Sequence, residues 1–62
     1  MTQKELLYVE DAIGHENNII SICNETIGCL SDDKLISFMK NEVKKHINLR
    51  DKLLSLLKEK YE

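Results

Sequence analysis

The sequence predicts an all-α fold, an antiparallel helical hairpin that dimerises into a four-helix bundle. Two stretches of the 62-residue chain carry apolar residues in alternating steps of three and four, the spacing of a helix that packs against another helix. One short polar segment, residues 31–33, separates the two stretches. The chain contains no proline and two glycines, so little in it interrupts a helix. A chain of this length holds one domain, and we expect that domain to span residues 1–62.

The first helix is expected over residues 3–29. Thr2 and Glu5 have the spacing of a capping box, in which each side chain accepts a hydrogen bond from the backbone N–H of the other residue at the helix start. Gly28 weakens the far end of the helix. Glu16 is the one charged member of the row that should face the second helix. That row consists of Leu6, Val9, Ile13, Glu16, Ile20, Cys23, Ile27 and Leu30.

The second helix is expected over residues 32–60. Ser31, Asp32 and Asp33 are good N-cap and first-turn residues, and no glycine or proline follows them. Two long helices joined by so short a turn must lie antiparallel. The apolar face of this helix is wide. It has a central row of Met39, His46 and Leu53, flanked on one side by Leu35, Glu42, Leu49 and Leu56 and on the other by Ile36, Val43, Arg50 and Leu57.

Each helix has more apolar surface than one neighbouring helix can cover. The first helix carries a second row beside the first, made of Ala12, His15, Ile19, Ile22, Thr26 and Cys29. A lone hairpin would leave this surface in water, whereas a second copy related by a twofold axis would cover it. The sequence therefore predicts a homodimer, with an interface formed by Ile19, Ile22, Cys29, Leu49 and Leu56.

Composition and charge exclude several classes of function. Eleven acidic and nine basic residues give a net charge of −2, and Lys44 and Lys45 are the only adjacent basic pair, which argues against nucleic acid as a partner. No apolar run is long enough for a transmembrane span or a signal peptide, so we expect a cytoplasmic protein. Cys23 and Cys29 lie about 9 Å apart along one helix, too far for a disulfide, and are expected to be buried free thiols.

A group of polar residues interrupts the apolar rows at mid-length. In a hairpin that turns near residue 31, facing positions add up to about 62, so Glu16 should meet His46. Glu42 lies one turn before His46, Arg50 one turn after it, and His15 borders Glu16. The sequence therefore predicts a buried polar layer of Glu16, His46, Arg50 and His15. A buried charge without a partner costs several kcal/mol, so the layer needs compensation.

Three arrangements could offset the cost of burying these polar side chains. An ion pair of Glu16 with His46 or Arg50 would fix the register of the helices and needs no cofactor. A metal site would use Glu16, Glu42 and His46, doubled by symmetry, since di-iron and di-manganese bundles combine glutamates with Glu-x-x-His pairs. The spacing here is four rather than three, which argues against iron or manganese. General-base catalysis by Glu16 or Glu42 with His46 is disfavoured, because a solid bundle of this size has little room for a substrate.

One arrangement of charged residues covers nearly the whole chain. It runs from Lys4, Glu5 and Leu6 through Glu10 and Asp11 to His15 and Glu16, followed by a short polar turn and a helix with a central His46. In this arrangement the chain resembles the small clostridial spore-coat-type proteins, which are related to the coat F and ferritin-like helical families. Ferritin-like kinship implies a four-helix bundle with a metal layer at Glu16, Glu42 and His46. Coat-type kinship implies a protein that associates with itself or with other coat components.

The leading expectation is a non-enzymatic helical protein of spore-coat type that works by self-association. The first alternative is a ferritin-like bundle that binds iron or manganese. The second alternative is a regulatory hairpin that docks on the helices of another protein.

Overall fold

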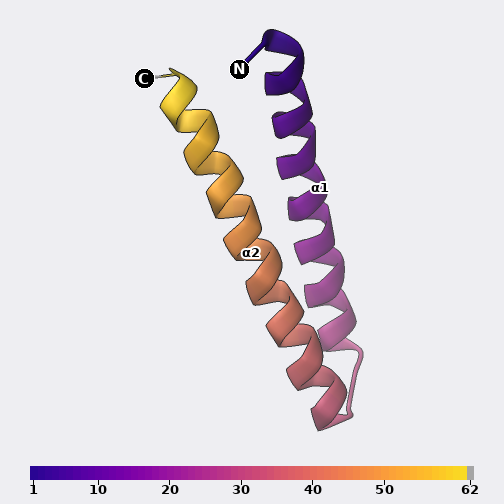
Figure 1. Ribbon diagram of the computed structural model, residues 1–62. Coiled ribbons are helices and arrows are strands. Elements are labelled where there is room, and N and C mark those ends of the chain that lie inside the picture. The colour runs from indigo at the N-terminus through magenta and orange to yellow at the C-terminus, as the bar shows by residue number, and fades with distance from the viewer. Residues whose placement is uncertain (62) are drawn as a thin grey trace.

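The computed structural model describes residues 1–61, with side chains through Glu59. Within that part the chain forms two helices, α1 (Gln3–Gly28) and α2 (Asp33–Tyr61), which pack against each other. The helices run antiparallel, so the beginning of α1 and the end of α2 lie at the same end of the molecule (Figure 1). The predicted all-helical hairpin is confirmed, and each observed helix end lies within one residue of the expected position.

The start of α1 has the capping box that the sequence predicts. The Thr2 hydroxyl accepts a hydrogen bond from the Glu5 backbone N–H at 3.1 Å, and the Glu5 carboxylate accepts one from the Thr2 backbone N–H at 2.8 Å. Two of the N–H groups that every helix start leaves unpaired are thereby satisfied. This fixes where the apolar row of α1 begins.

The connection between the helices is short and locally hydrogen-bonded. At the end of α1 the Cys29 backbone N–H donates to the carbonyl of Thr26 at 2.9 Å, which tightens the last turn. Asp32 then caps α2, because its carboxylate accepts from the Leu35 backbone N–H at 3.0 Å and its carbonyl accepts from the Ile36 N–H at 3.0 Å. The four residues from 29 to 32 thus reverse the chain direction.

The row of α1 that was expected to face α2 does so. Every one of its eight members is half-buried, except Ile20, which is buried. The matching row of α2 consists of Ile36, Met39, Val43, His46, Arg50, Leu53 and Leu57, and its members are likewise half-buried or, for Val43, buried. We call the two rows together the seam. Ile20 and Val43, each 9% exposed, are the buried hydrophobic residues of the described chain.

The hairpin is a thin rod. Its extents are 45 × 14 × 12 Å, and its radius of gyration is 14.4 Å, whereas a compact domain of this length would have about 10.6 Å. Its accessible surface is 4896 Å², compared with about 4100 Å² for a compact monomer of 7.2 kDa. About 800 Å² more surface is therefore in water than folding of a single compact chain would leave.

Neither helix, over the described residues, is long and apolar enough to cross a membrane.

Candidate functional site

A second row of side chains lies on the same side of both helices. In α1 it contains Tyr8, Ala12, His15, Ile19, Ile22, Thr26 and Cys29, and in α2 Leu35, Phe38, Glu42, Lys45, Leu49, Lys52 and Leu56. Each member directly precedes a seam residue, so it is turned by about 100° in the same sense about its own helix axis. Because the helices are antiparallel, equal rotations about the two axes point to the same side of the hairpin. We call this side the open face.

The open face is largely apolar and uncovered. Nine large hydrophobic residues are exposed in the described part of the chain, and six of them lie on this face. The six are Tyr8, Ile22, Leu35, Phe38, Leu49 and Leu56. Concentration of exposed apolar side chains on one face is typical of a protein interaction surface rather than of scattered surface residues.

The five residues predicted to form a dimer interface all lie on the open face. Ile22, Leu49 and Leu56 are exposed, and Ile19 is half-buried beside the seam. Cys29 is a free thiol, but it is exposed rather than buried as expected, because this C-cap residue of α1 directly precedes the seam residue Leu30 and so lies on the open face. Cys23 is free and half-buried in the seam.

Glu16 and His46 meet in the seam, as the numbering of the hairpin predicts. The Oε2 atom of Glu16 lies 2.5 Å from Nδ1 of His46, with 13% of the Glu16 side chain and 29% of the His46 side chain exposed. When the imidazole is protonated, this hydrogen bond is also an ion pair. The pair satisfies two polar groups that would otherwise interrupt an apolar seam, and it marks the register of the two helices.

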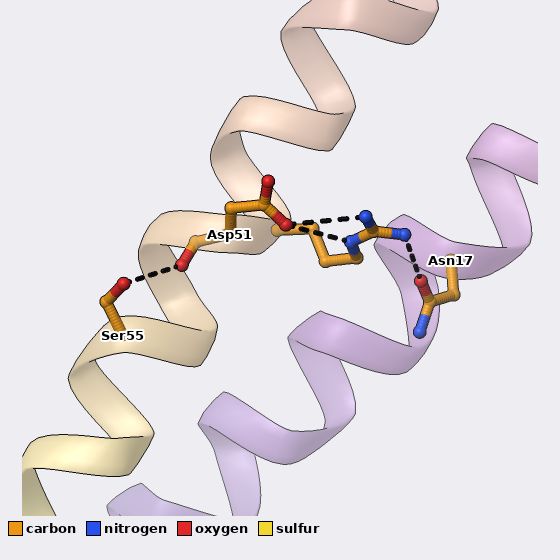
Figure 2. Close-up of polar contacts among 4 residues, drawn as sticks. Asn17, Asp51 and Ser55 are labelled. Carbon is orange, nitrogen blue, oxygen red and sulfur yellow. Dashed lines mark hydrogen bonds and ion pairs between the residues drawn. The ribbon is translucent and has the colours of Figure 1, made fainter.

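Arg50 does not join that pair, contrary to one of the expected arrangements. Its guanidinium donates to the Asn17 side-chain oxygen at 3.0 Å across the helices and to the Asp51 carboxylate at 3.3 and 3.4 Å along α2. Figure 2 shows Asn17 and Asp51 on opposite sides of the guanidinium, with Ser55 bonded to the backbone of Asp51. Asn17 and Asp51 each directly follow a seam residue, so this cluster lies on the side away from the open face.

The other polar residues of the predicted layer are not gathered around Glu16 and His46 within one chain. His15 is exposed instead of buried, because it lies one position before the seam, on the open face. The Glu42 carboxylate, half-buried, forms an ion pair with Lys45 at 3.3 Å. Among residues 1–61 no group of three or more acidic, histidine or cysteine side chains is arranged to hold a metal ion, and no ligand-sized pocket opens.

The chain matches no family model, and neither a curated protein nor a solved structure shows significant similarity to it. The open face and the Glu16–His46 pair are the two features of the described chain that bear on its function.

The Glu16–His46 pair gives a testable comparison of a single variant with a double variant. We expect Glu16→Leu to lower the free energy of unfolding by about 1 kcal/mol, because His46 then loses its partner in a partly dry seam. Glu16→Leu combined with His46→Leu should be at least as stable as the wild type, since packed leucines replace a polar pair well. Urea unfolding followed by circular dichroism, at one protein concentration, measures both effects. A single variant as stable as the wild type would contradict the assignment.

Proposed function

We propose that this protein is non-enzymatic and acts by self-association, with its open face as the interface and a homodimeric four-helix bundle as the basic unit. The uncovered open face carries the proposal, since six exposed hydrophobic side chains lie on one side of a rod that is only two helices wide. Burial of such a face is the strongest driving force for association that the chain offers.

The accessible surface area of the hairpin supports a second copy of the chain as the partner that covers the open face. The hairpin has about 800 Å² of accessible surface beyond that of a compact chain of its mass. A standard protein interface buries about 800 Å² on each partner. A second copy laid along the open face would therefore remove about as much surface as the hairpin has in excess, and the resulting bundle would enclose Ile19, Ile22 and Leu49 in a common core.

The resemblance to spore-coat-type proteins is in keeping with a role in assembly. Under this proposal the hairpin is made in the cytoplasm and is incorporated into a spore coat by contacts with itself or with other coat components. The dimer is then the building unit, and further association uses surfaces outside the open face.

A metal-binding bundle is the second candidate, and the contact between Glu16 and His46 is the observation that favours it. One chain offers this carboxylate and imidazole as neighbours, and dimerisation would place two such pairs at the same level of the bundle. Iron or manganese would then need both chains for its ligands.

Sedimentation of the purified protein at low micromolar concentration tests the proposed function. We expect a dimer of twice the 7.2 kDa chain mass that dissociates on dilution. A folded monomer at every concentration would overturn the proposal and would favour docking of the hairpin on the helices of another protein. Iron and manganese analysis of the same sample, prepared without chelator, tests the second candidate, which requires stoichiometric metal in the dimer.

A further inference from the structure

We propose that the dimer has its twofold axis parallel to the helices, so that α1 of each chain packs on α2 of the other. This geometry deepens the proposed function and rests on it. It follows from the distribution of charge between the two helices and from the register that the Glu16–His46 pair fixes within one chain.

The two helices carry opposite net charge. Helix α1 contains five acidic residues and one basic residue, a net charge of −4. Helix α2 contains eight basic and four acidic residues, a net charge of +4. The overall charge of −2 therefore hides an acidic rod lying beside a basic rod.

Two twofold axes can stack the open faces of two copies. An axis parallel to the helices places each α1 over α2 of the second copy, whereas an axis across the helices places α1 over α1 and α2 over α2. Both give antiparallel neighbours, so helix direction does not choose between them. The net charges of the helices do choose between them. The axis parallel to the helices pairs α1, with a charge of −4, with α2, with a charge of +4, whereas the other axis pairs helices of like charge.

Charged residues at the edges of the open face, each three or four positions from a member of its row, show the same complementarity at the level of single residues. An axis parallel to the helices preserves height along the bundle, so a residue of α1 faces the position of the second copy that completes a sum of about 62. Asp11 then lies near Lys52 of the second copy, Glu25 near Lys34, and Lys4 near Glu59. All six residues are exposed, and none forms an ion pair among the described side chains. The alternative axis would place the edge of α1 that holds Asp11 and Glu25 beside the same acidic edge of the second copy.

The native Cys29 provides a direct measure of the arrangement. Cys29 is exposed at the turn, 13 positions beyond Glu16. In the proposed dimer the Cys29 residues of the two chains therefore lie at the same end of the bundle. They are carried by the two α1 helices, which are diagonal neighbours about 13 Å apart. In the alternative arrangement, centred at the level of Glu16, the two Cys29 residues would lie at opposite ends, about 39 Å apart. Spin labelling of Cys29 in a Cys23→Ser variant and electron paramagnetic resonance distinguish the two. A distance near the longer value would overturn the proposed geometry.

A charge-reversal cycle tests the predicted contact between Asp11 and Lys52. We expect Lys52→Glu to raise the dimer Kd about tenfold, because two attractive rim pairs become repulsive, and Asp11→Lys to do the same. The double variant Asp11→Lys, Lys52→Glu should return the Kd to within about twofold of the wild type. Lys44→Glu, an exposed reversal on the side away from the open face, is the matched control and should change Kd less than about twofold.

The outcomes separate the geometry from the proposed function. Additive losses in the double variant, or distant Cys29 labels in a dimer, would overturn the parallel axis and leave self-association intact. A wild-type protein that is monomeric at every concentration would overturn both. Far-ultraviolet circular dichroism of each variant establishes that its helices are formed before Kd is compared.

Discussion

Val43→Asp is expected to unfold the hairpin. Val43 is 9% exposed in the seam, and an aspartate there would bury a charge that has no cationic partner prepared for it. An uncompensated buried charge costs about 3–5 kcal/mol, which equals the whole stability that a core of this size supplies. Circular dichroism at 222 nm should show loss of most helical signal at 25 °C.

Lys44→Asp is the matched control for that prediction. It introduces the same side chain one position further along α2, where the residue is exposed and away from α1. Surface substitutions of this kind change stability by about 0.5 kcal/mol or less, so the helical signal and the melting temperature should stay close to those of the wild type. Equal behaviour of the two variants would show that the seam does not hold the fold together.

The fold of one chain could be predicted from sequence because its signals are local and agree with one another. Thr2 and Glu5 mark the start of α1, and Asp32 marks the start of α2, each through a side-chain hydrogen bond to the backbone three residues away. The short turn leaves no alternative to an antiparallel pair. The contact of Glu16 with His46 then follows from counting residues away from the turn.

The polar partners of the seam were less predictable, because the apolar spacing fixes heights along the helix but not the direction of a long side chain. Arg50 could reach several acceptors within a turn of its own height. It bonds to Asn17 and Asp51, which both directly follow a seam residue and so lie beside it on one side of the hairpin. The signal that could have identified Asn17 as a partner of Arg50 is this shared position directly after a seam residue, on the side where Arg50 also points.

The opposite charges of the two helices would act at two contacts, the one between α1 and α2 within a chain and the one between the open faces of two chains. Within one chain the acidic α1 lies beside the basic α2, and the same opposition would act again between chains if the twofold axis is parallel to the helices. Reversing a charge in the seam would weaken both the attraction between α1 and α2 within one chain and the attraction between the two chains, so it cannot separate them. Substitutions at the outer edge of the open face change only the contact between chains.

Ile22→Glu is expected to abolish the dimer at micromolar concentration while the helices remain formed. Ile22 is 53% exposed on the open face, so in the proposed bundle the rest of its surface becomes covered. Loss of that burial costs about 1 kcal/mol per copy, and desolvation of the introduced carboxylate adds about 1–3 kcal/mol. Because the change occurs in both chains, the dimer Kd should rise at least about 100-fold. Sedimentation over a dilution series measures the shift.

Leu7→Glu provides the comparison that makes the Ile22 result specific. Leu7 is 55% exposed, nearly the same as Ile22, but it directly follows the seam residue Leu6, so it lies on the side away from the open face. An identical loss of apolar area and gain of charge at this position should leave Kd within about threefold of the wild type. If surface hydrophobicity alone drove association, the two variants would weaken it equally. A large effect confined to Ile22 would instead require that one defined face of the rod is covered by the second chain.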